Sequence, residues 1–355
     1  MNFDNPHIGF VVASYGITAF VLLSLIAWIL LRARRTADRL RLLEAEGGPR
    51  RRPRHAAPRP VSTPASSPSS SASSPIRRSD GEVPQLGRPL DPARARTYAR
   101  KSMRFNAWGV TDVGRKRDHN EDSFLMSAEL GLYAVADGMG GHQGGERASR
   151  LALDVLEAEI AVARKEGGPI DESATNGSPA RALERATQRA GEQIFLTAQS
   201  DPDVAGMGTT LTSLLVHRGR AYLAHVGDSR CYLYRDGRCV QLTEDHSWVN
   251  EQVRAGLLSK EEAKDSKFKH IITRSVGFER HVAVDGGTVA IEPGDCFLLC
   301  SDGLSNLIEG DEMARVLAAN FYKKVPALLI DIANDRGGDD NITVVLLHAA
   351  NDAAR

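Results

Sequence analysis

Lysine is absent from the first 100 residues of this 355-residue chain, which hold 16 arginines and only 7 acidic residues. The remaining residues lack any basic excess, because they contain 29 basic and 38 acidic side chains. The formal net charge of zero therefore conceals a basic leader joined to an acidic body. Since nucleic-acid binding needs a basic face, we expect the body to have no nucleic-acid partner.

Cysteine is scarce, and no Cys-x-x-Cys pair occurs. Each cysteine lies in or beside an apolar run, which predicts buried free thiols and a reducing compartment instead of disulfides. The four are Cys231, Cys239, Cys296 and Cys300.

Charged side chains are missing from residues 8–31, and arginines follow this run closely. At about 1.5 Å per residue, a helix of this length reaches roughly 36 Å, enough to cross a bilayer. No Lys or Arg precedes the run, as a cleaved signal peptide would require. The positive-inside rule then predicts a single membrane span with the following residues in the cytoplasm. A buried core helix is the alternative.

Composition divides the chain into three regions. Residues 1–47 are predicted to form the transmembrane helix and a short amphipathic helix lying on anionic membrane lipid. Residues 48–100, rich in Pro, Ser and Arg, are predicted to be a disordered linker. Residues 101–350 have the pattern of a globular domain.

Apolar runs of strand length dominate that domain, and most follow one another directly, which predicts antiparallel sheets with helices packed outside. Tyr234-Arg235-Asp236-Gly237 predicts a hairpin turn. The predicted strands are 105–111, 132–136, 211–217, 221–226, 231–235, 288–291, 296–300 and 342–348, and the predicted helices are 148–165, 180–198, 248–255, 260–264, 311–319 and 325–334.

Five short acidic turns stand out, most of them directly after a strand-like run. One such turn alone is usually only a turn. Together they indicate a shared pocket, and because carboxylates packed together repel each other, such a pocket needs cations. Oxygen ligands suit Mg²⁺ or Mn²⁺. The turns are 120–122, 137–141, 227–230, 301–304 and 337–341; the candidate ligands are Asp122, Asp137, Asp302 and Asp340, with Gly138 and Gly303 permitting close approach.

Basic residues precede the first acidic turn, ending with Arg117. A cation beside an anionic metal cluster suggests that a further anion binds between them. Arg117 can hold a phosphoryl group with two parallel hydrogen bonds, and metal ions with an arginine suit hydrolysis of a phosphate ester. A surface salt bridge is the alternative interpretation of Arg117.

These motifs make the chain resemble bacterial type 2C protein phosphatases, the metal-dependent PPM family of Ser/Thr phosphatases, over residues 105–348. The resemblance implies an α+β fold, an α-β-β-α sandwich of two antiparallel sheets. It also implies a dinuclear Mn²⁺ or Mg²⁺ centre whose metal-bound hydroxide attacks phosphoserine or phosphothreonine proteins, the substrates of a Ser/Thr kinase. The matching stretches are TDVGRKRDHNEDSF, YAVADGMGG, GMGTTL, HVGDSRCYLY, LTEDHS, ITRSVG, LLCSDGL and GGDDNITVVL.

The resemblance also implies a role for each site residue. Arg117 matches the phosphate-binding arginine, and Asp137 matches the aspartate that bridges the two ions. The other implied positions are the Gly138 carbonyl in the first coordination sphere, Asp302 and Asp340 at one ion, Asp122 at the other, Asp228 with Asp302 at a third, labile ion, and Glu121 and Asn341 just outside the ligands.

Two stretches depart from the family pattern. Met139 stands where animal members have a histidine as presumed general acid, so the proton donor is open; His142 is the nearest candidate, and a structural histidine is the alternative. Residues 266–270 (Ser-Lys-Phe-Lys-His) replace the more usual His-Pro-x-Arg-Asn. They lie in residues 245–285, which match the family's flap beside the site, so substrate preference is open as well.

The leader has a resemblance of its own. Residues 1–52 resemble haem exporter protein D, a one-helix accessory of the cytochrome c maturation transporter, through His7, Trp28 and the arginines after Leu31. This resemblance implies haem exporter subunits as partners and a place in the bacterial inner membrane. A generic membrane anchor is the alternative. The second functional hypothesis is therefore a haem-export accessory with an appended phosphatase domain.

Overall fold

The computed structural model describes residues 103–140, 143–165 and 178–350. The chain divides into two compact units, Met1–Arg77 and Arg78–Arg355, and every described residue belongs to the second. The predicted membrane helix, the linker and His142 lie outside the described residues. Among the described helices, none combines the length and the apolar character needed to cross a membrane.

Two antiparallel sheets form the centre of the domain, as the sequence predicted. The first sheet has the strand order β1-β11-β10-β7-β8. Its strands are β1 (Arg104–Asp112), β7 (Arg230–Arg235), β8 (Arg238–Gln241), β10 (Cys296–Cys300) and β11 (Ile342–Ala350). The predicted hairpin turn joins β7 to β8, where Asp236 and Gly237 both have positive φ, 52° and 76°. Two such residues match the type I′ turn that favours antiparallel pairing.

The second sheet has the order β2-β3-β5-β6-β9, and the short β4 pairs with β3. Its strands are β2 (Asp122–Ser127), β3 (Leu132–Met139), β4 (Gly208–Thr209), β5 (Leu211–His217), β6 (Arg220–Val226) and β9 (Asp285–Ala290). The sequence analysis missed β2, β4 and β8. These strands are short or only partly buried, so they lack the apolar runs that identified the others.

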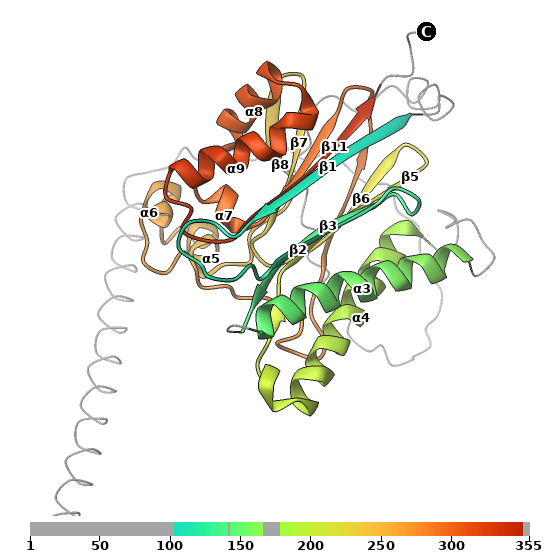
Figure 1. Ribbon diagram of the computed structural model, residues 1–355, viewed down its shortest axis with the longest axis vertical. Coiled ribbons are helices and arrows are strands. Elements are labelled where there is room, and N and C mark those ends of the chain that lie inside the picture. Colours follow the sequence, from blue (N-terminus) through green and yellow to red (C-terminus); the bar gives the residue numbers. More distant parts are fainter. Residues whose placement is uncertain (1–102, 141–142, 166–177, 351–355) are drawn as a thin grey trace, which may run out of the picture. The chain divides into compact units, whose positions relative to one another are not determined.

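Helices cover the outer faces of both sheets, so the layers are α-β-β-α (Figure 1). On the second sheet lie α3 (Gly144–Lys165) and α4 (Pro179–Ser200), and on the first lie α8 (Gly310–Ala319) and α9 (Val325–Asp335). A third apolar cluster fills the space between the sheets, with Val135 and Leu214 from one sheet and Phe297 and Val345 from the other. The expected sandwich is therefore confirmed.

Short helices lie at the edge of this sandwich. They are α5 (Trp248–Arg254), α6 (Lys260–Lys264), α7 (Asp302–Ser305), η1 (Pro202–Val204) and η2 (Tyr322–Lys324). The first two belong to residues 245–285, which we call the flap. The four-residue α7 was not predicted, because the Ser-Asp-Gly motif at its start has the composition of a turn.

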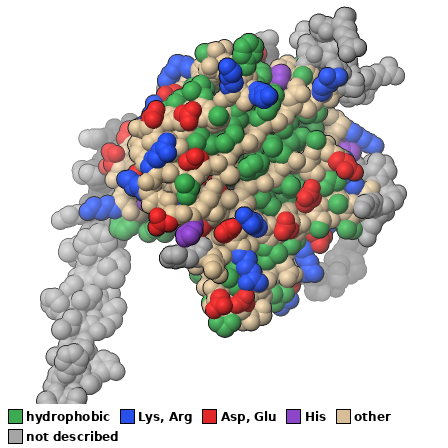
Figure 2. All heavy atoms as spheres, viewed as in Figure 1, with side chains coloured by type: hydrophobic (Ala, Val, Ile, Leu, Met, Phe, Trp, Pro, Cys, Tyr) green, Lys and Arg blue, Asp and Glu red, His purple; other side chains and the backbone are tan. Residues whose placement is uncertain are grey.

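The surface and the cysteines agree with the composition. Figure 2 shows basic side chains lying among acidic ones on the face in view, so the described part of that face has mixed charge. Cys231, Cys296 and Cys300 are buried, Cys239 is half-buried, and all four are free thiols.

Candidate metal centre

The acidic turns meet at one cavity. It has a volume of about 700 Å³ and opens where β3, α7 and the turn before β11 come together. Asp118, His119, Met139, Lys269, His270 and Asp339 share its wall with the predicted residues. The predicted site residues that line it are Arg117, Glu121, Asp137, Gly138, Asp228, Asp302, Asp340 and Asn341.

Asp137 lies near the end of β3, directly opposite Asp122 of β2 in the antiparallel register. Directly opposite side chains have Cβ atoms about 4.5–5.5 Å apart, and like charges there destabilise a sheet. Two threonines hold the backbone at this point. The N–H of Asp137 donates to Thr210 Oγ1 (2.9 Å), and its carbonyl accepts from Thr209 Oγ1 (2.8 Å). The sequence analysis found these threonines only as part of a family motif.

Asp122 lies beneath the cavity and does not line it. Its Oδ2 accepts hydrogen bonds from Ser301 Oγ and Thr343 Oγ1, both at 2.7 Å. These hydroxyls belong to the first sheet and its following turn, whereas Asp122 belongs to the second sheet. The bonds therefore join the two sheets under the cavity floor.

Asn341 organises the loop that carries the arginine. Its Nδ2 donates to the carbonyls of Val113 and His119, both at 2.9 Å, and its Oδ1 accepts from the N–H of Glu121 at 2.8 Å. The side chain of Glu121 reaches the cavity wall. Asn341 thus fixes the path of residues 113–121, and with it the position of Arg117.

Two cations of this loop face the acidic turn before β11. Arg117 Nη2 lies 2.9 Å from Asp340 Oδ2, and Lys116 Nζ lies 2.5 Å from Asp339 Oδ1. The Arg117 side chain remains 50% exposed in this pair. Exposed ion pairs contribute little stability, about 0–1 kcal/mol, so a stronger anion can replace Asp340 as its partner.

Several carboxylate oxygens of the cluster have no described partner. Oδ1 atoms of Asp122, Asp228 and Asp302 are buried, and none receives a hydrogen bond from a described residue. Leaving a buried acceptor unbonded costs about 1–3 kcal/mol, and more for a charged one. Such oxygens, in a set without sulfur or imidazole ligands, fit hard divalent cations such as Mn²⁺ or Mg²⁺.

Burial and mutual repulsion disfavour the charged forms of these acids. Burial raises the pKa of Asp122 to about 7, although the bonds from Thr343 and Ser301 oppose the shift. Burial, followed by the charge of Asp122, raises the pKa of Asp137 well above its usual value. The pKa values of Asp228 and Asp302 are raised as well, first by burial and then by neighbouring carboxylates. A bound cation would reverse this balance.

These carboxylates line a cavity but do not form a closed ligand set. Within residues 103–140, 143–165 and 178–350, no group of three or more His, Cys, Asp or Glu side chains could hold a metal ion as it stands. The fit to a metal therefore rests on the unbonded oxygens and on the chemistry of the donors.

Gly138 and Gly303 are needed for close approach of backbone. A Cβ on Gly138 would lie 2.1 Å from the Gly145 carbonyl oxygen, and a Cβ on Gly303 would lie 2.1 Å from the Asn341 carbonyl oxygen. Both contacts lie far inside van der Waals distance. The neighbour that requires glycine is therefore a backbone carbonyl in each case, whereas the expected approach of backbone or water to the ions stays a prediction.

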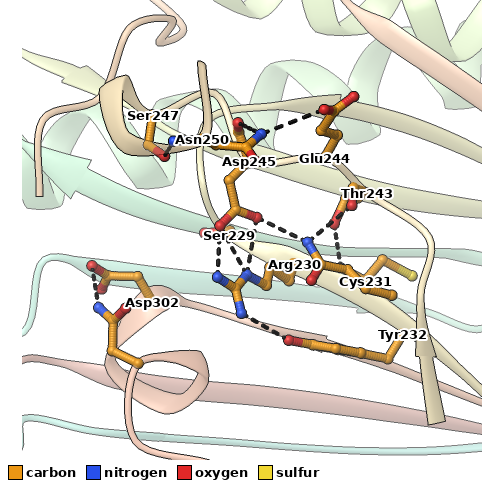
Figure 3. Close-up of polar contacts among 12 residues, drawn as sticks. Ser229, Arg230, Cys231, Tyr232, Thr243, Glu244, Asp245, Ser247, Asn250 and Asp302 are labelled. Carbon is orange, nitrogen blue, oxygen red and sulfur yellow. Dashed lines mark hydrogen bonds and ion pairs between the residues drawn. The ribbon is translucent and has the colours of Figure 1, made fainter. Parts of the chain in front are cut away.

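A second cavity of about 730 Å³ lies under the flap and shares Asp228, Asp302 and Lys269 with the first. Its main polar feature is the ion pair between Arg230 and Asp245, drawn in Figure 3, in which Arg230 Nη2 lies 2.6 Å from Asp245 Oδ2. The sequence analysis named none of these flap contacts, because long-range pairs between polar side chains leave no local pattern.

The sandwich and its acidic, arginine-rimmed cavity define a class of protein, the metal-dependent phosphatases. Residues 114–334 match the protein phosphatase 2C family, and the chain belongs to that family. It is thus a phosphoprotein phosphatase, and enzymes of this family use Mn²⁺ or Mg²⁺.

Individual relatives agree with this assignment. The serine/threonine phosphatase stp of Listeria welshimeri is 40% identical over 241 residues, which cover 67% of this chain and 93% of that protein. The solved structure of the Mycobacterium tuberculosis phosphatase PstP/Ppp has a TM-score of 0.62 at 34% identity, covering 70% of this chain and 99% of that one. A structure of the PstP catalytic domain in complex with two manganese ions has a TM-score of 0.61 at 33% identity, covering 70% and 100%.

The leader matches a different family. Residues 6–48 are similar to heme exporter protein D. This match lies outside the described residues, so its structural consequences remain predictions.

Proposed function

We propose that this chain hydrolyses phosphoserine and phosphothreonine in proteins at a dinuclear Mn²⁺ or Mg²⁺ centre in the acidic cavity. The supporting observation is the meeting, on one wall, of carboxylates with unbonded buried oxygens and an arginine in a weak ion pair. When bound, the two ions polarise the phosphoryl oxygens and make a water acidic near neutral pH.

The chain's residues then have separate tasks. Asp137 would hold both ions, because it lies in the cavity wall opposite Asp122 and near the other acids. The other residues that would hold the two ions are Asp302, Asp340 and, through its carbonyl, Gly138, with Asp122 below them. Asp228 would hold a third ion with Asp302, and Glu121 and Asn341 would support the ligands from outside.

Arg117 binds the phosphate. Its guanidinium is half exposed, and its present partner Asp340 is a proposed metal ligand. With Asp340 engaged as a metal ligand, the guanidinium of Arg117 would be free to make two parallel hydrogen bonds to phosphoryl oxygens. Removal of Arg117 should therefore affect substrate binding more than turnover.

The leaving serine or threonine oxygen needs a proton. Met139, in the cavity wall, has none to give, whereas His119 and His270 line the same cavity. If one of them is the donor, its Gln variant should lose activity on a phosphoserine peptide but retain it on an aryl phosphate, whose leaving group needs no proton. Equal losses on both substrates would exclude that histidine as the donor.

Phosphate release measures the proposed activity. A protein of residues 101–355 should hydrolyse a phosphothreonine peptide with Mn²⁺ and stop when chelator is added, and Asp137→Ala should be inactive while still folded by circular dichroism. Mn²⁺-independent turnover, or none with Mn²⁺, would refute the proposal. Mass spectrometry of proteins from cells that express inactive Asp137→Ala would then identify substrates and, through their sites, the class of kinase.

We also propose that residues 1–47 anchor the enzyme in the bacterial inner membrane, with the phosphatase domain in the cytoplasm. The similarity of residues 6–48 to heme exporter protein D favours a second function in haem export, in contact with the transporter subunits. Residues 1–52 alone should then restore cytochrome c in a strain lacking its own exporter D. Membrane fractionation without such rescue would support the anchor and exclude the haem role.

A further inference from the structure

Asp228 lies in the short turn between β6 and β7, at the boundary between the two cavities. It is only 7% exposed, and its Oδ1 receives no hydrogen bond from a described residue. A hydrogen bond to Oδ1 therefore does not fix the orientation of the Asp228 side chain. The side chain is carried by a tight turn that begins at Gly227, which has a positive φ of 111°.

One side of this turn is bonded to the strand that carries Asp137. Ser229 Oγ lies 2.8 Å from Thr210 Oγ1, and Thr210 Oγ1 accepts from the N–H of Asp137. A Cβ on Gly227 would lie 2.6 Å from Thr210 Cβ, so the Thr210 side chain packs directly against the backbone of Gly227. These contacts with Thr210 fix the position of the turn that carries Asp228 relative to Asp137.

The other side is held by two successive residues, Asp245 and His246, just before α5. The Gly227 N–H donates to His246 Nδ1 (3.0 Å), and the His246 N–H donates to the Gly227 carbonyl (2.8 Å). Arg230, the first residue after the turn, donates from Nε and Nη2 to both oxygens of Asp245 (Figure 3). The turn is thus bonded at both ends, and Asp228 lies between them.

His246 also joins the turn to the returning segment of the flap. Its carbonyl accepts from the Thr273 N–H at 2.8 Å, and its Nε2 lies 3.1 Å from Asp285 Oδ2. Because a backbone N–H can only donate, Nδ1 must be the acceptor, which leaves the proton on Nε2, facing Asp285. Arg274 Nη1 also lies 3.0 Å from Nε2, and with the proton there this contact is not a hydrogen bond. Arg274 Nη1 donates to the other oxygen of Asp285 at 2.7 Å.

We propose that Asp245 and His246 are positioning residues that hold Asp228 in the cavity and couple its position to the flap. This inference rests on the proposed function, since it assigns Asp228 a part in ion binding. Residues that orient metal ligands typically change metal affinity or activity by about 10–100-fold when they are removed. A disturbance of the flap would reach Asp228 through His246 without any contact between the flap and the ion.

Variants of the full chain, purified in detergent, separate positioning from general support of the fold. In His246→Asn the amide oxygen can accept from Gly227 in place of Nδ1, so Mn²⁺ affinity should stay within a few-fold of the parent value. His246→Gln and Asp245→Asn should weaken Mn²⁺ binding in calorimetric titrations by about 10–100-fold, and lower kcat while KM stays nearly constant. Asp228→Asn, and Asp228→Asn with His246→Gln, complete a double-mutant cycle.

The control is Asp295→Asn. Asp295 makes a bidentate pair with Arg235 at the far end of the same strand, β7, and is more deeply buried than Asp245. That variant should lose stability but retain the parent's Mn²⁺ titration. If His246 acts through Asp228, the double variant should be no worse than Asp228→Asn alone. Additive losses, or parent-like Mn²⁺ binding in His246→Gln, would overturn the proposal, whereas an inactive parent would instead refute the proposed function.

Discussion

Asp122→Asn should stabilise the metal-free enzyme while impairing its activity. Asp122 is buried with one oxygen in two hydrogen bonds and the other in none, and its pKa is raised from 3.8 to about 7. The folded state therefore binds this proton more tightly than the unfolded state. That contribution to stability is fully present below pH 3.8 and is lost as the pH rises through 7.

The magnitude follows from the size of the shift. At about 1.4 kcal/mol for each pKa unit, the charged carboxylate costs the metal-free fold about 4 kcal/mol at pH 8 and about 2 kcal/mol at pH 5. An asparagine avoids this cost, but its NH₂ replaces the unbonded oxygen and has no described partner, which costs about 1–3 kcal/mol. Asp122→Asn should therefore gain about 2 kcal/mol at pH 8 and almost nothing at pH 5.

Urea unfolding of residues 101–355 in chelator, at both pH values, tests this reasoning. Solved relatives consist of this domain alone, which covers 99–100% of their chains. With Mn²⁺ the order should reverse, because the ions stabilise the charged form of the parent protein. Two results would show that repulsion and burial do not destabilise the metal-free cluster. In one, Asp122→Asn is less stable than the parent in chelator at pH 8; in the other, its unfolding free energy differs from the parent's by the same amount at both pH values.

Three further predictions concern other parts of the domain. Arg117→Ala should raise KM by about 10–100-fold and change kcat less, because it removes a charged hydrogen bond to the phosphate worth about 1.5–3 kcal/mol. Steady-state kinetics that show only a loss of kcat would argue against phosphate binding by Arg117. Burial, and then the charge of His246, lower the pKa of His225 from 6.5 to about 4, so its contribution to stability is present above pH 6.5 and is lost as the pH falls toward 4. Between pH 7 and 4.5, His225→Gln should thus lose about 2 kcal/mol less unfolding free energy than the parent in urea titrations, and an equal loss would contradict this account. Gly303→Ala should lower the free energy of unfolding by about 1–3 kcal/mol and remove most of the activity, because the new methyl group would clash with the Asn341 carbonyl. Unchanged kinetics would show that this turn can shift freely.

Apolar runs and the turns after them predicted antiparallel sheets with helices outside and most of the acidic cavity, whereas the α-β-β-α layering was implied by the family resemblance. Strands buried on both faces appear as apolar runs, and the turns that follow them carry the carboxylates. β10 (Cys296–Cys300) and β5 (Leu211–His217) were predicted at their observed bounds because each is bordered by polar residues. Helix starts were less accurate: α3 begins at Gly144, four residues before its prediction, since its first turn is polar and rich in glycine.

The parts that escaped prediction depend on contacts between distant residues. The register of β2 places Asp122 opposite Asp137, but β2 is mostly half-buried and mixes polar with apolar residues, so it lacks an apolar run. The hydroxyls of Ser301 and Thr343 are ordinary polar residues until the two sheets bring them to Asp122. The acidic residues could be identified from their residue type and their order along the chain. The neutral groups that hydrogen-bond to them can be identified only from the three-dimensional structure.

The location of these neutral groups explains how a fold can support a cluster of repelling acids. A carboxylate held by arginine would lose part of its affinity for a metal ion, because the arginine already neutralises it. Hydroxyl donors fix Asp122 without neutralising it, and threonine holds only the backbone of Asp137. Because the bonds to Asp122 also join the two sheets, we expect repulsion in the cavity to weaken the interface between them when no cation is bound. Metal binding and cohesion of the sandwich should therefore be linked, with the metal-free enzyme opening first at the edge where the two sheets share this site.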